Sequence, residues 1–147
     1  MNNSSMDDLV RERILQKVEV LIDRIAFIEH HLSDAVMNDR ILRKALYKEF
    51  QEAVESATDI CALIRRILLS SAQDDYTNLD YLVGEGIISR ETGRDLKAAN
   101  GLRNRLVHEY DGINDHIAYG AMQRLMPSLR RFSGEVLTWL NANRTRS

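Results

Sequence analysis

Apolar side chains recur at alternating intervals of four and three residues near the start of the chain. The six residues of this series are Ile14, Val18, Leu21, Ile25, Ile28 and Leu32. Such intervals place all of them on one stripe of an α-helix, as in a helix that packs along a bundle. The series predicts a long helix over residues 7–32. A second apolar set lies off this stripe and indicates that the helix also faces another helix or another subunit: Val10, Leu15, Ile22 and Phe27.

Helical spacing of apolar residues continues in the next segment. It predicts a second helix over residues 39–70, followed by a loop in the polar segment 70–75. A short third helix is expected around residues 79–83, ahead of a glycine-containing turn. Cys61 lies beside the apolar stripe of the second helix, where we expect an inert core thiol.

Two further helices complete the predicted architecture. Ser89 is a favourable N-cap for a fourth helix that runs toward Tyr110. Asn114 can cap a fifth helix that runs toward Leu140, and Pro127 within it removes one backbone donor and should introduce a kink.

The proline and glycine content supports the same fold class. The 147 residues include one proline and seven glycines, which favours long helices over a turn-rich β architecture. We predict an all-α, antiparallel bundle of four to five helices that forms one domain over residues 1–147, with residues 1–6 flexible. The single cysteine, the absence of a signal-peptide pattern and the absence of a long apolar run predict a cytoplasmic protein with no membrane partner.

The charge distribution gives a weak indication of where a polyanion would bind. The net charge is −2 overall, yet residues 101–147 hold 7 Lys and Arg against 4 Asp and Glu. A polyanion site would therefore lie toward the C-terminal third. Arg124, Arg130 and Arg131 could guide RNA there, or could simply be solvated on a helix surface.

Reactive side chains are concentrated near the end of the predicted fourth helix. Arg103, Asn104, His108 and Tyr110 lie within eight residues. Histidine can act as a general acid or base on a ribose 2′-hydroxyl, and arginine can bind a phosphate whose negative charge develops during transesterification. Asn104 and His108 are four residues apart, so we expect the amide to hydrogen-bond and orient the imidazole.

Arg103 and His108 do not share a helix face, because five residues correspond to about 140° of rotation. Two copies of this helix facing each other across a homodimer would bring both kinds of side chain together, so the spacing favours a composite site. The alternative interpretation is structural, with Arg103 in a surface ion pair, His108 at an interface and Tyr110 packed at its rim.

The pattern Arg103-Asn104-x-x-x-His108-x-Tyr110 resembles the R-N-x-x-x-H-x-Y signature of the HepT-like ribonuclease toxins of the HEPN superfamily. Residues around this motif, Gly86-Ile87-Ile88 and Ala57-Thr58-Asp59-Ile60 also resemble that family, over roughly residues 8–142. The resemblance implies a homodimeric helical bundle that cleaves RNA with no metal and no cofactor. It also implies a toxin restrained by a cognate MntA-like nucleotidyltransferase antitoxin.

The same resemblance assigns roles to residues of the motif. Arg103 and His108 would be catalytic and Asn104 supporting, while Tyr110 would support the site and accept AMP from the antitoxin. A bulky anionic group on Tyr110 would block substrate and repel its phosphates. The alternative hypothesis is a non-catalytic HEPN module that binds a nucleotide or its nucleotidyltransferase partner without cleaving RNA.

Other candidate residues lie outside the motif. Asp59 of the second helix could orient Arg103 across the bundle as a supporting residue, or could be solvated. Glu29-His30-His31 contains possible metal ligands, but adjacent helical residues diverge by about 100°, so we expect no metal site there. His116 could approach the motif, although a surface position is the simpler expectation.

Overall fold

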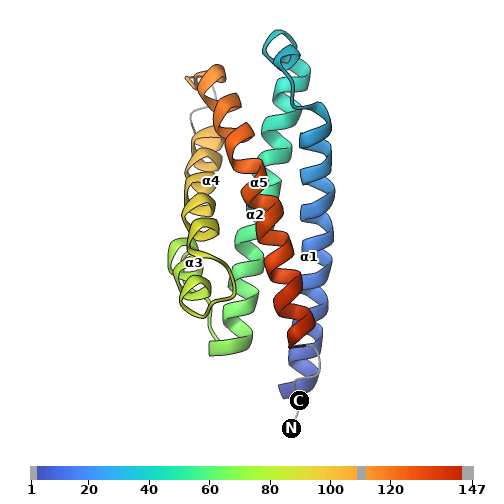
Figure 1. The fold of residues 1–147 in the computed structure, drawn as a ribbon, viewed down its shortest axis with the longest axis vertical. Helices are drawn as coiled ribbons and strands as arrows, with labels where there is room; N and C mark the ends of the chain where they lie inside the picture. Colours follow the sequence, from blue (N-terminus) through green and yellow to red (C-terminus); the bar gives the residue numbers. More distant parts are fainter. Residues whose placement is uncertain (1–2, 109–111, 144–147) are drawn as a thin grey trace.

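The computed structural model describes the backbone of residues 3–108 and 112–143, with side chains from residue 7 onward. These ranges contain helices and no strand, so the prediction of an all-α fold is confirmed. Four long helices run alternately up and down as an antiparallel bundle, and a short helix packs beside them (Figure 1). The elements are α1 (Asn3–His31), η1 (Asp34–Asn38), α2 (Arg40–Leu69), α3 (Asp75–Gly84), α4 (Arg90–His108) and α5 (Asp115–Ala142).

The apolar series that predicted α1 forms one side of the core. The first five of its members are at most 1% exposed, and Leu32 is partly buried. The second apolar set behaves differently, because Leu15, Ile22 and Phe27 remain 44%, 36% and 36% exposed. The backbone of α1 is helical from Asn3 onward.

Side-chain caps fix the starts of α2, α3 and α5, as well as that of α4, which is described below. The carboxylate of Asp39 accepts from the backbone N–H of Leu42 at α2, and Asp74 accepts from Thr77 at α3. Asn114 accepts from Ile117 at α5, as predicted. The helix α3 is longer than its apolar residues indicated, because the Asp74 cap makes it begin at Asp75. The single 3₁₀ turn between α1 and α2 was not predicted.

The N-terminal end of α4 is fixed by contacts to α3 and α5. The Ser89 hydroxyl accepts from the Thr92 N–H, which confirms the predicted cap. A Cβ at Gly93 would lie 2.5 Å from Cγ2 of Val83, so α3 and α4 pack closely at this position. Gly86 has a φ of +73°, which the turn between the two helices requires and which glycine adopts without strain. These contacts set the position of the helix that carries the motif.

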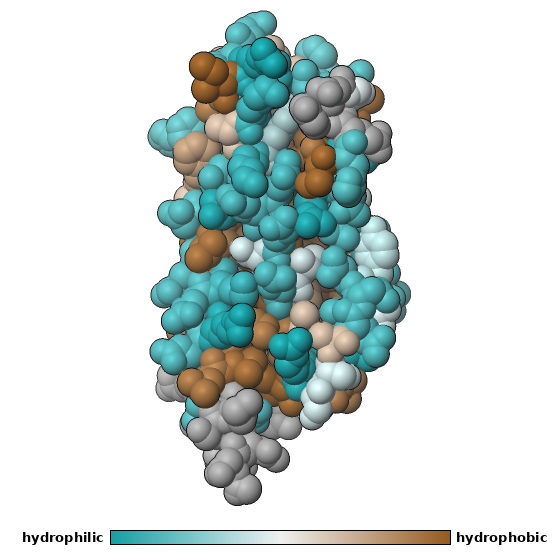
Figure 2. All heavy atoms as spheres, turned by 180° about the vertical axis from the view of Figure 1, so that it is seen from behind, coloured by the Kyte–Doolittle hydropathy of each residue, from teal (hydrophilic) through white to brown (hydrophobic). Residues whose placement is uncertain are grey.

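The core and the surface differ sharply in polarity. Cys61 is fully buried, and burial raises the pKa of its thiol, which confirms the expected core cysteine. The face in Figure 2 is mostly polar, with apolar side chains in separate small groups. Among the helices described, none is both long enough and apolar enough to cross a bilayer. Pro127 lies inside the continuous helix α5.

Candidate functional site

The motif occupies the last two turns of α4. Arg103 and Asn104 are partly buried, and His108, the last residue of the helix, is exposed. The Arg103 side chain reaches α2, whereas His108 makes no hydrogen bond or ion pair with another described residue. The two groups therefore point in different directions within one chain, as the spacing predicted. Tyr110, the predicted acceptor of AMP, lies outside the described residues.

Two side-chain oxygens fix the guanidinium of Arg103. Its Nη2 donates to Oε2 of Glu55 at 2.9 Å, and its Nη1 donates to Oδ1 of Asn104, also at 2.9 Å. The Nε atom is buried and makes no hydrogen bond within the described part of the chain. Arginine is permanently charged, so this arrangement presents a positively charged donor in a defined orientation at the surface.

The expected partners of Arg103 and His108 need correction at two positions. Asp59 does not hold Arg103, because its carboxylate pairs with Nζ of Lys17 on α1 at 3.1 Å, and Glu55, one turn earlier on α2, takes that place. Asn104 does not orient His108 through its side-chain carbonyl, because that oxygen accepts from Arg103 instead. A hydrogen bond from a charged donor is the stronger of these two alternatives.

A groove between α2 and α4 adjoins the motif. Its volume is about 300 Å³. We call it the α2–α4 groove, and the residues that line it are Lys44, Tyr47, Lys48, Gln51, Leu106 and Val107. The last two lie between Arg103 and His108 in the sequence, so the groove wall is part of the motif itself. This groove was not predicted from the sequence, although the four-residue interval between Lys44 and Lys48 places them on a shared helix face.

One wall of the groove is fixed by a contact to α5. The Tyr47 hydroxyl donates a hydrogen bond to Asp115, the first residue of α5. Nε of Arg43 lies 3.3 Å from the same carboxylate. Burial, followed by the hydrogen bond to Asp115, raises the pKa of Tyr47, so the phenol stays neutral at physiological pH. The ring of Tyr47 is therefore held in place without adding negative charge.

Two of the three C-terminal arginines, Arg130 and Arg131, make contacts to other helices. Arg130 pairs with Glu29 of α1. Arg131 donates to Thr92 and Ser128 and lies 3.6 Å from a carboxylate oxygen of Asp95. These contacts connect α5 to α1 and to α4. Arg124 is exposed and remains a candidate contact.

The remaining candidates stay at the surface. Glu29 is occupied by Arg130, and Nδ1 of His31 lies 2.9 Å from the carbonyl oxygen of Phe27. His30 and His116 are exposed. Within the described ranges, no three His, Cys, Asp or Glu side chains are grouped so that they could hold a metal ion.

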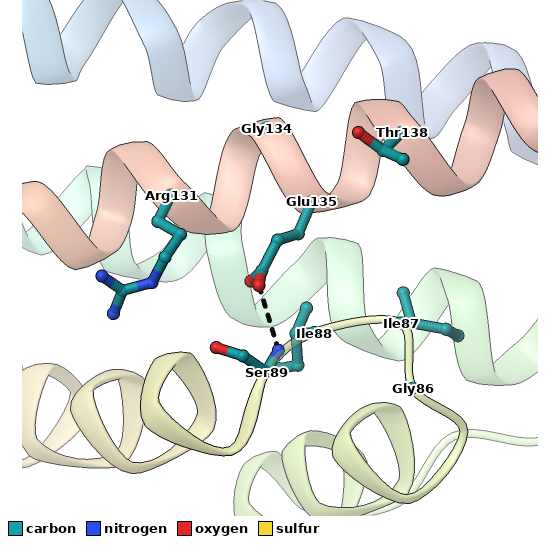
Figure 3. Close-up of a pocket in the computed structure, with 8 residues that line it drawn as sticks. All are labelled: Gly86, Ile87, Ile88, Ser89, Arg131, Gly134, Glu135 and Thr138. Atoms are coloured by element: carbon teal, nitrogen blue, oxygen red, sulfur yellow. Dashed lines mark hydrogen bonds between the residues drawn. The ribbon is translucent and has the colours of Figure 1, made fainter.

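A second pocket, larger than the α2–α4 groove, lies beside the N-terminal end of α4. It has a volume of about 700 Å³ and is lined by residues 86–89 and by α5 (Figure 3). Within it, Oε2 of Glu135 accepts from the backbone N–H of Ser89 at 3.1 Å. Figure 3 shows the Glu135 side chain extending from α5 toward Ser89, and the Arg131 side chain extending from α5 toward α4. These contacts secure the start of the motif helix.

The sequence of this chain matches one known protein family and is similar to two proteins of one organism. The model of the family described as Ribonuclease HepT-like matches residues 12–136. A predicted RNase of Archaeoglobus fulgidus is 30% identical over 122 residues, which cover 83% of this chain and 89% of that protein. A second predicted RNase of the same organism is 31% identical and covers 81% of this chain and 84% of its own length.

Solved structures share the fold. One is a tri-AMPylated HEPN toxin of Shewanella oneidensis in complex with an MNT antitoxin, with a TM-score of 0.77 and 23% identity, covering 85% of this chain and 96% of its own. Another is YutE of Bacillus subtilis, described as a cytosolic protein of unknown function, with a TM-score of 0.80 and 18% identity, covering 90% of this chain and 92% of its own.

Proposed function

The chain belongs to the Ribonuclease HepT-like family, and from this premise we propose that it is an endoribonuclease toxin that needs no metal ion. The observation that carries the proposal is the pairing of Arg103 with Glu55 and Asn104, which holds a cation in a fixed orientation beside a groove. His108 stands near this cation in the sequence with its imidazole exposed. The two predicted RNases of Archaeoglobus fulgidus support the same activity.

The proposed reaction is an internal transesterification of RNA. The imidazole of His108 takes the proton of a ribose 2′-hydroxyl, and the 2′-oxygen then forms a bond to the adjacent phosphorus. The bond from phosphorus to the 5′-oxygen breaks, and a protonated histidine supplies the proton to that leaving oxygen. Arg103 stabilises the negative charge that builds on the phosphoryl oxygens.

We propose that the active form is a homodimer. Arg103 turns toward α2 while His108 is exposed at the end of α4, and we propose that the two groups meet on one substrate phosphate across two chains. A two-fold axis near the end of α4 would pair Arg103 of one chain with His108 of its partner. The exposed apolar side chains of α1 offer a further surface that a second subunit could cover.

We further propose that a nucleotidyltransferase antitoxin restrains the enzyme in the cytoplasm by attaching AMP to Tyr110. The AMPylated Shewanella oneidensis toxin in complex with its antitoxin supports this mode of control, and the cytosolic YutE supports the location. Each attached AMP adds a phosphate charge and a base beside the motif, so it would exclude RNA by bulk and by repulsion. Co-expression with the antitoxin should add AMP to the intact mass of the wild type and not to that of Tyr110→Phe.

The central test compares three variants for RNA cleavage and growth inhibition. His108→Ala and Arg103→Ala should each abolish both activities while the helical content is retained, because the assigned roles are chemical. His30→Ala removes an exposed histidine of α1 and is the matched control, which should keep wild-type activity. Activity that survives loss of His108, or that disappears in a chelator, would instead favour a metal-dependent reaction or the non-catalytic binding module.

A further inference from the structure

A third pocket lies between the last turns of α4 and the start of α5, and we call it the α4–α5 pocket. Its volume is about 140 Å³, and its apolar walls are formed by Leu102, Ile113, Ile117 and Ala118. Leu102 and Ala118 are buried, whereas Ile117 is 61% exposed, so the pocket is apolar inside and open at one edge. A cavity of about 150 Å³ can hold a benzene ring, so this pocket has room for one six-membered ring.

Two polar side chains complete the lining of the pocket, Arg105 of α4 and Asn114, which precedes α5. Oδ1 of Asn114 accepts from the backbone N–H of Ile117 and caps α5. This bond fixes the orientation of the amide, and Nδ2 of Asn114 is left as a donor with no hydrogen bond to another described residue. Uracil and cytosine each carry a carbonyl oxygen that can accept from such a donor, whereas adenine has none.

Arg105 is the exposed cation of the pocket. It makes no hydrogen bond or ion pair with any residue that the structure describes. Asp115 does not neutralise it, because that carboxylate is engaged by Arg43 and Tyr47. A guanidinium can bind a phosphate bidentately and can stack on a planar ring. The pocket therefore combines a slot for one ring, a directed donor and a cation, which together match one nucleotide.

Arg105 lies on the same side of α4 as His108. Both residues belong to one continuous helix, Arg90–His108, in which residues three apart differ by about 60° of rotation and have Cβ atoms about 5–6 Å apart. Arg103, by contrast, is about 140° away from His108. The imidazole is thus within one helical turn of a side chain that lines the pocket. Because a base is attached to its own ribose, one nucleotide can place its base in the pocket and its 2′-hydroxyl at His108.

From these observations, and resting on the ribonuclease function proposed above, we infer that the α4–α5 pocket binds the pyrimidine base of the nucleotide whose 2′-hydroxyl reacts. Arg105 binds a phosphate of that nucleotide, and the amide of Asn114 donates to the carbonyl oxygen of the base. The pocket thereby selects where RNA is cut, on the 3′ side of uridine or cytidine. Arg105 and Asn114 are specificity residues in this assignment.

The first test uses 2′-O-methyl RNA strands with a single ribonucleotide, because only that nucleotide then has a 2′-hydroxyl. The full-length wild type should cleave strands with uridine or cytidine at this position at least about fivefold faster, in kcat/KM, than the strand with adenosine. Asn114→Ser keeps a capping side chain but removes the amide donor, so the preference for uridine over adenosine should fall about three- to tenfold. Equal cleavage of all four strands by the wild type would overturn the inference.

The second test measures binding by fluorescence anisotropy, with 2′-deoxyuridine in place of the single ribonucleotide so that no cleavage occurs. Arg105→Gln should lower the salt slope by about 0.7, the value for one phosphate contact of a single strand, which is about fivefold weaker binding at 0.1 M than at 1 M salt relative to wild type. The matched control is Arg90→Gln, an exposed arginine on the same helix, about 22 Å away along its axis. The control should bind within about twofold of wild type, and equal losses in both variants would point to a net-charge effect and overturn the inference.

The two tests separate failure of this inference from failure of the proposed function. If the wild type cleaves RNA and Arg105→Gln behaves like Arg90→Gln, only the inference fails. If Arg105→Gln keeps its cleavage and base preference but is no longer modified by the antitoxin, the pocket serves that partner and the inference also fails. If the wild type cleaves no RNA, the proposed function fails, while stronger binding of 2′-deoxyuridine than of 2′-deoxyadenosine, lost in Asn114→Ser, would still identify the pocket as a pyrimidine site.

Discussion

At the scale of single residues, the contact between Glu55 and Arg103 is the feature that the sequence did not reveal. Asp59 and Glu55 are one turn apart on the same side of α2, and either carboxylate could in principle reach an arginine on a neighbouring helix. Apolar periodicity predicts which face of a helix is buried. It does not determine how far one helix is shifted along the other, and that shift selects Glu55. The motif residues themselves were recognisable because their types and spacing are distinctive.

Glu55 should act as a positioning residue for Arg103. Glu55→Ala removes the acceptor at 2.9 Å and frees a long side chain that is otherwise held in one orientation. We expect RNA cleavage to fall about ten- to hundredfold, mainly in kcat, because misplacing a charge-stabilising group is costly. Glu55→Gln keeps an oxygen acceptor and should recover part of the rate. Asp59→Asn is the control and should leave the rate unchanged; a Glu55→Ala enzyme as fast as wild type would contradict this role.

At the scale of helices, local signals predicted most elements and missed those that depend on tertiary contacts. The long helices α1, α2 and α5 follow apolar stripes and recognisable caps, so their ends lie within a few residues of the predicted ones. The ion pairs of α2 were not predicted, because the acidic sum over residues 1–100 does not show which carboxylate meets which cation. The ion pairs of Arg130 and Arg131 were not predicted either, because their partners come from α1 and α4, far away in the sequence.

The close approach of α3 to α4 gives a prediction about stability. Gly93→Ala would put a Cβ 2.5 Å from Cγ2 of Val83, a branched side chain with little freedom to move away. Overpacking of this kind costs about 1–3 kcal/mol, which outweighs the roughly 1 kcal/mol that alanine gains over glycine in a helix. The free energy of unfolding from chemical denaturation should therefore fall.

Two variants control this prediction. Gly120→Ala places a Cβ in open space on α5 and should raise the free energy of unfolding by up to about 1 kcal/mol. Adding Val83→Ala to Gly93→Ala removes the clash and should restore part of the loss, although it also removes apolar contact. An unfolding free energy for Gly93→Ala equal to or above the wild-type value would show that α3 and α4 can separate here at no cost.

At the scale of the whole molecule, the divergence of the two proposed catalytic side chains has a consequence for assembly. The Arg103 guanidinium is tied to α2, while His108 ends α4 with its ring exposed. If a dimer joins Arg103 of one chain to His108 of the other, each active site depends on both chains. Two inactive variants should then complement each other, whereas a site built within one chain should not recover.

The decisive experiment mixes Arg103→Ala and His108→Ala proteins under conditions that allow subunit exchange. Random exchange makes half of the dimers mixed, and each mixed dimer holds one site with an intact Arg103 and an intact His108 and one site with neither. Recovery should therefore approach about one quarter of wild-type RNA cleavage, because half of the dimers carry one of two sites. Light scattering and a tag on one variant verify that mixed dimers form. A double variant with both substitutions in one chain, mixed with wild type, supplies the control, since exchange then creates no new intact site. Mixed dimers that form and stay inactive would rule out the shared site and assign Arg103 and His108 to the same chain, with the guanidinium leaving Glu55 to reach the substrate.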